Sequence, residues 1–194
     1  MEPVPEPEHV WSRLVSAREA YRAAVPPEYD EVLLEVAQRA EDAGSIGKAD
    51  IGALVVWKRL PANTRWVSEL MSVPEADVRA VTARAVAAVR DVSLVRGEAA
   101  QQGREVLWEL PGFRHGAALA SAVLTAAAPQ RMAVYDRRAR QGLEWLGYSL
   151  GGPRGRYGRY MDLLGDLLDR SGPGTEGWTA RDVDTALYWL GGQG

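Results

Sequence analysis

Apolar residues in this chain recur at the three- and four-residue spacing of helices, and they nowhere alternate with polar residues over a useful length. This periodicity predicts amphipathic helices, whereas strands would need alternation in steps of two. Proline and glycine end the pattern repeatedly. We therefore expect an all-α fold with no significant sheet.

The pattern predicts ten helices between these breaks. Asp50 and Asp136 directly precede two of them, and aspartate is a preferred N-cap residue. The helix expected over 117–128 is almost entirely small or apolar, so it should be buried on every side. The expected ranges are 10–24, 29–43, 51–60, 64–71, 75–91, 99–109, 117–128, 137–147, 160–169 and 180–190.

Composition removes several classes of chemistry. The chain has no cysteine, which excludes disulfides, thiol catalysis, iron–sulfur clusters and zinc–thiolate sites. Its two histidines, His9 and His115, make a histidine-built metal site unexpected, and we predict no cofactor. The acidic, proline-rich start does not resemble a signal peptide, and no apolar run has membrane-spanning length. The expected compartment is the cytoplasm.

Charge is unevenly distributed along the chain. The formal net charge is −3, but residues 131–160 carry seven arginines and two acids, whereas residues 1–50 carry eleven acids and five bases. A basic stretch of this kind suits contacts with phosphates. It is equally typical of a solvated arginine-rich face.

The segment 107–147 carries the most information about function. A helix ends at Leu110-Pro111-Gly112, and the small-residue helix starts a few residues later. Such a hairpin directs unpaired backbone N–H groups and a helix dipole outward, which makes an anion site. A loop then delivers Asp136 to the start of another helix.

This segment resembles the helix-hairpin-helix DNA glycosylases, whose pattern is L-P-G-x-G, a small-residue helix and a loop ending in V-x-D. The hairpin matches at 110–112, the helix at Ala118, Ala120 and Ala122, and the loop at Pro129 and 134–136. More closely, the chain is similar to the compact bacterial 8-oxoguanine-glycosylase-like (OGG-like) family, whose opening helix resembles residues 51–60. The resemblance covers roughly residues 50–150.

The resemblance implies a two-lobed helical fold with the active-site cleft between the lobes. Residues 1–8 would then be a flexible acidic tail. Residues 9–49 would be N-terminal helices packing on the second lobe, residues 50–135 the hairpin lobe, and residues 136–194 C-terminal helices that complete the cleft.

Two departures from the family pattern bear on the expected chemistry. Arg114 stands where the second hairpin glycine would be, so we expect the phosphate cradle to exchange a flexible glycine for a guanidinium. The lysine that bifunctional members place just after the hairpin is replaced by Gly116-Ala117. Only Lys48 and Lys58 occur in the chain, so we predict a monofunctional enzyme without Schiff-base lyase activity. Lys58 could still approach the pocket from the first helix of the domain.

The resemblance makes Asp136 the catalytic carboxylate. It would stabilise the positive charge that base departure leaves on the sugar, and it would orient or deprotonate the attacking water. The competing interpretation of Asp136 is a plain N-cap. The predicted DNA contacts are Gly112, Phe113, Arg114, His115, Gly116, Arg137, Arg138, Arg154, Arg156 and Arg159. The predicted base-pocket or wedge residues are Trp57, Lys58, Arg59, Asn63, Trp145, Tyr188 and Trp189, although most of the aromatic residues could instead belong to the core.

The expected partner is double-stranded DNA containing modified bases, and no membrane or obligate protein partner is implied. The OGG-like resemblance suggests an oxidised or alkylated purine and hence DNA repair. Some similar bacterial proteins instead remove glucosylated hydroxymethylcytosine in antiviral defence, and we favour that hypothesis. A non-catalytic helix-hairpin-helix DNA-binding module and a degenerate scaffold without DNA affinity remain open.

Overall fold

The part of the chain that the computed structural model describes, residues 7–62, 64–172 and 174–192, contains ten α-helices, one short 3-10 helix and no strand. The all-α expectation is therefore confirmed for these residues. None of their helices has the length and apolar character needed to cross a membrane. The elements are α1 (Pro7–Ala24), η1 (Pro27–Asp30), α2 (Glu31–Ala43), α3 (Lys48–Trp57), α4 (Arg65–Ser72), α5 (Glu75–Arg90), α6 (Arg96–Leu107), α7 (Ala118–Ala127), α8 (Arg137–Trp145), α9 (Arg156–Asp169) and α10 (Ala180–Leu190).

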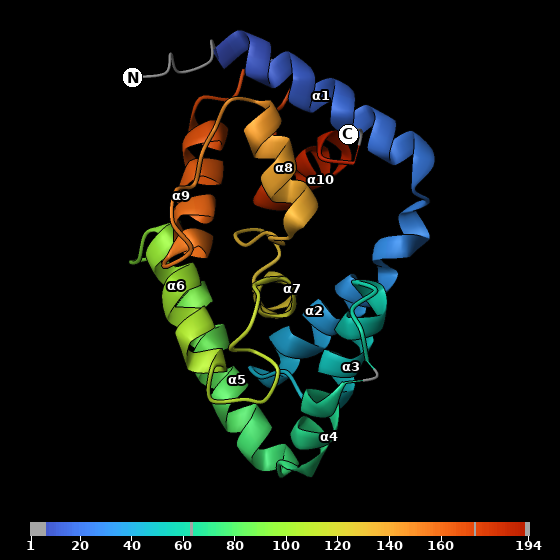
Figure 1. The fold of residues 1–194 in the computed structure, drawn as a ribbon, viewed down its shortest axis with the longest axis vertical. Helices are drawn as coiled ribbons and strands as arrows, with labels where there is room; N and C mark the ends of the chain where they lie inside the picture. The colour runs from blue at the N-terminus through green and yellow to red at the C-terminus, as the bar shows by residue number, and fades with distance from the viewer. Residues whose placement is uncertain (1–6, 63, 173, 193–194) are drawn as a thin grey trace.

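Helix α7 lies in the middle of the molecule, where Figure 1 views it almost along its axis. Helices α1, α8, α9 and α10 lie above it in that view, α3, α4 and α5 lie below, and α6 and α2 lie to its left and right. Every residue from Leu119 to Ala127 is buried, as the run of small and apolar side chains predicted. Because these side chains are short, α2, α3, α5 and α6 all pack against this one helix.

The first two long helices pack on different parts of the molecule. Helix α1 packs on α10, whereas α2 packs on α7 and α3. Pro26 and Pro27 separate them, because proline cannot continue a helix interior. Residues 1–6 of the expected tail lie outside the described residues, and Pro7 already belongs to α1.

Helices α1, α3, α6 and α9 each begin three or four residues before the predicted start. Gly47, and not Asp50, is the N-cap of α3, and Asp50 is the third helical residue, whose carboxylate accepts the Gly47 N–H at 3.3 Å. Helix α9 begins at Arg156 and not near residue 160, because Gly155 turns the chain with a left-handed φ of 66°. Arg156 and Arg159 therefore lie on a helix, where we expected a loop.

Helices α8 and α10 approach each other closely through glycine. A Cβ atom on Gly142 would overlap the backbone carbonyl of Leu187, and a Cβ on Gly191 would overlap the carbonyl of Arg138. The obstruction is backbone in both cases, so no side-chain rotation can relieve it. Since α8 begins directly after Asp136, this contact also sets where that carboxylate lies.

We expect Gly142→Ala to lower the free energy of unfolding by about 1–3 kcal/mol, the usual cost of overpacking a core. The matched control is Gly52→Ala, since a Cβ on this exposed glycine of α3 meets nothing within 4 Å. Alanine should stabilise that helix by about 0.5–1 kcal/mol. Urea denaturation of both variants measures the difference, and equal effects would contradict the close helix contact.

Candidate functional site

Asp136 stands where a buried stretch of chain meets the start of α8. Its Oδ1 atom accepts the backbone N–H of Ala139 at 2.8 Å, so the predicted N-cap is confirmed. The residues just before it, from Met132 to Tyr135, are all buried. The Asp136 side chain keeps 16% of its surface exposed. It is therefore a carboxylate held by the core that still reaches solvent.

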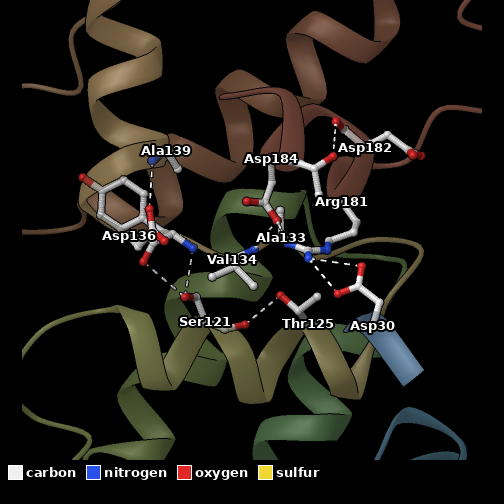
Figure 2. Close-up of polar contacts among 12 residues, drawn as sticks. Asp30, Ser121, Thr125, Ala133, Val134, Asp136, Ala139, Arg181, Asp182 and Asp184 are labelled. Carbon is white, nitrogen blue, oxygen red and sulfur yellow. Dashed lines mark hydrogen bonds and ion pairs between the residues drawn. The ribbon is translucent and has the colours of Figure 1, made fainter. Parts of the chain in front are cut away.

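Side chains from two helices pair with the backbone N–H groups ahead of Asp136 (Figure 2). The Ser121 hydroxyl on α7 accepts the Tyr135 N–H at 2.9 Å. The Asp184 carboxylate on α10 accepts the Val134 N–H at 3.2 Å. Buried amides need such partners because water cannot reach them. These two bonds align the segment that delivers Asp136.

Two tyrosine hydroxyls from α9 pair with the carbonyls of the same stretch. Tyr157 donates to the Ala133 carbonyl at 3.0 Å, and Tyr160 donates to the Val134 carbonyl at 3.2 Å. Burial raises the pKa of both phenols, so both remain hydrogen-bond donors at neutral pH. Helix α9 thus holds the segment from the opposite side.

A partly buried ion cluster surrounds Asp184, the one member whose side chain is almost fully enclosed. Arg181 contacts Asp184 at 2.6 Å and Asp30 at 3.2 Å (Figure 2). Burial raises the pKa of Asp184, and Arg181 partly offsets that effect. Burial also disfavours the charged form of Arg181, but the two carboxylates outweigh it and raise its pKa. Arg181 also lies 5.2 Å from the centre of the Trp57 ring. The cluster therefore connects α10 to the end of α3.

The nearest cation to the candidate carboxylate is Lys58. Its Nζ atom forms an ion pair with Asp136 Oδ2, although 78 residues separate the two in sequence. The Lys58 side chain is 14% exposed and lies 5.1 Å from the Tyr188 ring centre. Arg59 follows with a φ of 54°, the one positive φ of a non-glycine residue in the described ranges. This left-handed residue ends α3 where the lysine meets Asp136.

A cavity of about 480 Å³ opens beside Asp136, which we call the hairpin cavity. This volume is within the usual range for small-molecule sites. Its walls come from the loop after α3, the start of α4, the hairpin and the first turns of α7, α8 and α9. The lining residues are Leu60, Pro61, Thr64, Trp66, Gly112, His115, Gly116, Ala117, Ala118, Leu119, Tyr135, Asp136, Arg137, Arg140 and Arg156.

The electrostatics of the hairpin cavity favour an anion. Helices α7, α8 and α9 all begin at its wall, and a helix N-terminus carries partial positive charge. Arg137, Arg140 and Arg156 add full charges, and Asp136 is the one carboxylate among the described lining residues. Among the described residues, no three acidic or histidine side chains lie close enough together to hold a metal ion.

The hairpin turns through two glycines. Gly112 has a φ of 89°, and a Cβ there would overlap the Trp66 ring. Gly116 has a φ of 75°. Arg114, which replaces the second glycine of the family pattern, has no left-handed φ, so Gly116 provides the second such position two residues later. The Arg114 guanidinium instead donates to the Trp108 carbonyl at 2.9 Å.

A smaller cavity of about 70 Å³ lies on the other side of Lys58, and we call it the aromatic cavity. Four rings line it, from Tyr21, Tyr29, Trp57 and Tyr188, together with Val25, Lys58, Arg59, Arg181 and Thr185. Burial raises the pKa of Tyr21 to about 12. The ion pair of Lys58 and Asp136 therefore stands between an arginine-rich cavity and an aromatic one.

The structure brings many of the predicted residues to these cavities. Gly112, His115, Gly116, Asp136, Arg137 and Arg156 line the hairpin cavity, and Trp57, Lys58, Arg59 and Tyr188 line the aromatic cavity. Arg114 lines a neighbouring groove of about 530 Å³ that shares Trp66, Gly112 and His115 with the hairpin cavity. Arg138 lies near the aromatic cavity, where it donates to the Tyr188 hydroxyl at 2.9 Å.

Other predicted residues have different surroundings. Phe113 is 1% exposed, so its side chain belongs to the core and cannot contact DNA as we expected. Arg159 donates to the carbonyls of Leu150 and Arg154 and thereby organises its loop.

Neither cavity is lined by the remaining predicted residues that the structure describes. Arg154 is exposed on the loop before α9, and Trp145 is exposed at the end of α8. Trp189 packs edge-on against Tyr21, with ring centres 6.4 Å apart. Asn63 lies outside the described residues.

Sequence reasoning missed three residues that shape the site. Trp66 lines both the hairpin cavity and the neighbouring groove. Arg140 lies one helical turn after Arg137, so helical spacing alone could have identified it. Arg181 lies three residues before Asp184, but no local pattern distinguishes a buried ion pair on α10 from an exposed one.

In comparisons with known proteins, no protein-family model, no curated protein and no solved structure matches this chain.

We expect Asp184→Asn to destabilise the protein. Removing one partner of a buried ion pair typically costs about 3–5 kcal/mol. Because Asp30 would still pair with Arg181, we expect a loss of about 3 kcal/mol or less. The control is Glu144→Gln, which removes an exposed pair with Arg140 whose side chains are 54% and 41% exposed. That change should cost less than about 1 kcal/mol. Urea denaturation compares the variants, and an unchanged Asp184→Asn midpoint would contradict a supporting role for the cluster.

Proposed function

We propose that this protein is a DNA glycosylase that flips a modified base out of the duplex and hydrolyses its N-glycosidic bond, leaving an abasic site. The observation that carries the proposal is the single carboxylate, Asp136, at the wall of a cationic cavity formed by the hairpin. A residue that serves only as an N-cap requires neither a cavity beside it nor the N-termini of α7, α8 and α9 at the wall of that cavity.

Binding to DNA would rest on contacts with phosphates. The N-termini of α7, α8 and α9 offer backbone N–H groups, and Arg137, Arg140 and Arg156 offer guanidinium groups. Such contacts supply affinity without reading sequence. The turn at Gly112 and Gly116 would hold the strand beside Asp136, as the hairpin does in the family that the sequence resembles.

Catalysis would rest on the placement of Asp136. Extruding a nucleotide costs a few kcal/mol of unstacking, which the phosphate contacts would offset. As the base leaves, positive charge develops on the deoxyribose, and a fixed carboxylate stabilises it. The Ala139 N–H fixes Oδ1 of Asp136, so this group needs no rearrangement when the charge appears. The same carboxylate can accept a proton from the attacking water.

The arrangement of helices fits the two-lobed architecture that the resemblance implies. One lobe would comprise α2 to α7 with the hairpin, and the other α8 to α10 with α1. Of the N-terminal helices expected to pack on the second lobe, only α1 does so, because α2 packs on α7 and α3. The active-site cleft would lie between them, at the hairpin cavity. Asp136, at the junction of α7 and α8, would then face both lobes.

The substrate we propose is glucosylated hydroxymethylcytosine, and the role we propose is antiviral defence. The supporting observation is space. The groove of about 530 Å³ along the hairpin adjoins the hairpin cavity of about 480 Å³ and shares three lining residues with it. An ordinary base would leave much of this space empty, whereas a base carrying a hexose would use it.

We expect Asp136→Asn to fold and bind duplex DNA but to release base at least about 10²-fold more slowly, the usual loss when a transition-state contact is removed. Asparagine is as good an N-cap as aspartate, so α8 should persist. The measurement is abasic-site formation, detected as strand breaks after alkali. Glu144→Gln on the same helix serves as the control. Full turnover by Asp136→Asn would refute the catalytic assignment.

Three duplexes test the substrate: unmodified DNA, DNA with 8-oxoguanine, and DNA with glucosylated hydroxymethylcytosine. We expect alkali-dependent breaks in the glucosylated duplex. Breaks confined to the oxidised duplex would replace defence with purine repair. No breaks in any duplex, together with salt-sensitive binding, would favour a non-catalytic binding module.

We expect Arg140→Ala to weaken duplex binding and to reduce the slope of log affinity against log salt by about 1, the contribution of one phosphate contact. Arg170→Ala is the matched control, because Arg170 is exposed at the end of α9 and does not line the hairpin cavity. Fluorescence anisotropy with a labelled duplex at several salt concentrations measures both. Equal slopes for the two variants would remove the cavity from the DNA interface.

A further inference from the structure

A further cavity of about 460 Å³ lies between the second half of α1 and the start of α10, and we call it the α1 groove. It shares four lining residues with the aromatic cavity, namely Tyr21, Val25, Arg181 and Thr185. It shares none with the hairpin cavity. The α1 groove and the aromatic cavity therefore adjoin each other, and they form a surface separate from the proposed contacts with DNA.

The aromatic cavity suits the edge of one planar ring. Tyr21 meets Tyr188 edge-on, with ring centres 6.4 Å apart and ring planes at 89°, and Tyr29 is tilted by 41° from Trp57. The faces of these rings are therefore not stacked on one another, and aromatic rings favour such edge-on and offset neighbours. The volume of about 70 Å³ is roughly twice the share of one water molecule in the liquid, about 30 Å³. Anything larger than one ring must extend into the α1 groove.

The α1 groove offers N–H donors for an anion. Arg18 and Arg22 lie one helical turn apart on α1, so they are neighbours on the same face. Arg18 binds Asp182 through Nε at 2.9 Å and Nη2 at 2.5 Å, and its Nη1 atom has no partner among the described residues. Arg22 is exposed at the end of α1 and forms no ion pair within the described part of the chain. Two such guanidinium groups can bind one carboxylate.

The charge balance of the α1 groove favours a ligand with a single negative charge. Its lining contains three arginines and two aspartates. Both aspartates are already paired, Asp182 with Arg18 and Asp30 with Arg181 at 3.2 Å (Figure 2). Arg22 is therefore the one cation in excess. A carboxylate matches that excess, whereas a phosphate monoester would bring up to two charges.

We propose that the α1 groove and the aromatic cavity together bind a small aromatic carboxylate, a molecule with one aromatic ring joined to one carboxylate by a short chain. The ring would lie between Tyr21 and Tyr188, and the carboxylate would lie at Arg18 and Arg22. Burial raises the pKa of Tyr21 to about 12, so its hydroxyl stays a donor for a polar group on the ring. This binding site does not depend on the proposed activity toward DNA.

The test is isothermal titration calorimetry on the full chain without DNA. The probes are p-hydroxyphenylacetate, which has both parts, p-cresol, which has the ring alone, and acetate, which has the carboxylate alone. We expect saturable binding of p-hydroxyphenylacetate. Each smaller probe should bind at least about 10-fold more weakly, because it lacks either the charged hydrogen bonds or the burial of a ring.

Four variants locate the ligand. Arg22→Ala should weaken binding of p-hydroxyphenylacetate about 10-fold, the usual loss when a charged hydrogen bond is removed. Val25→Trp should also weaken it, because residue 25 lines both cavities and an indole would fill the space between them. Arg13→Ala is the matched control, since Arg13 is exposed on the same helix and lines neither cavity. Arg140→Ala should leave the affinity unchanged, because Arg140 lines only the hairpin cavity among these three.

Several outcomes would overturn the inference. One is the absence of saturable binding by p-hydroxyphenylacetate, and another is equal affinity for this acid and p-cresol. A loss of binding in Arg140→Ala would place the ligand in the hairpin cavity instead. Tighter binding of cytidine monophosphate than of the aromatic acid would assign the two cavities to a nucleotide. The wild-type titrations need no variant to fold, and thermal melts check the folding of each variant.

These outcomes are independent of the proposed function. Base release is measured on modified duplexes, and ligand binding is measured on the protein alone. If the chain releases base but does not bind the aromatic acid, only the second site is lost. If it binds the acid but releases no base, the glycosylase proposal fails and the second site stands.

Discussion

The site depends on a stretch of backbone that crosses the core between α7 and α8. Such a stretch cannot use water to satisfy its polar groups, and each orphaned group would cost about 1–3 kcal/mol. Ser121, Tyr157, Tyr160 and Asp184 supply the missing partners from three different helices. The position of Asp136 is thus set by the same hydrogen bonds that make the core possible. A loop on the surface could not hold a carboxylate with that precision.

The charges around this stretch form one connected system. Lys58 forms an ion pair with Asp136, and its positive charge also lowers the pKa of Asp184, which burial otherwise raises. Arg181 links Asp184 to Asp30. Charges that interact in a low-dielectric interior respond together when one of them changes. A ligand that displaces Lys58 from Asp136 would therefore also change the electrostatic environment of Asp184 on α10.

Local sequence patterns predicted most of the helices, and their failures have local causes. Asp50 looked like an N-cap, but Gly47 takes that position, and the aspartate caps from three residues inside the helix. The start of α9 was placed too late, because the left-handed turn at Gly155 lets the helix begin within an apparently loop-like stretch. Phe113 was assigned to a binding surface because the hairpin motif includes it, although its burial shows that it anchors the turn.

The sequence by itself determined the helical class, the burial of α7 from Leu119 to Ala127 and the role of Asp136 as a cap, because each of these depends on residues a few positions apart. The tertiary structure alone decided that Lys58 would meet Asp136, and that Arg140 and Arg156 would share a cavity with the hairpin. Those arrangements join segments far apart in the chain. They are set by the packing of whole helices against one another, and the local spacing of residue types does not predict that packing.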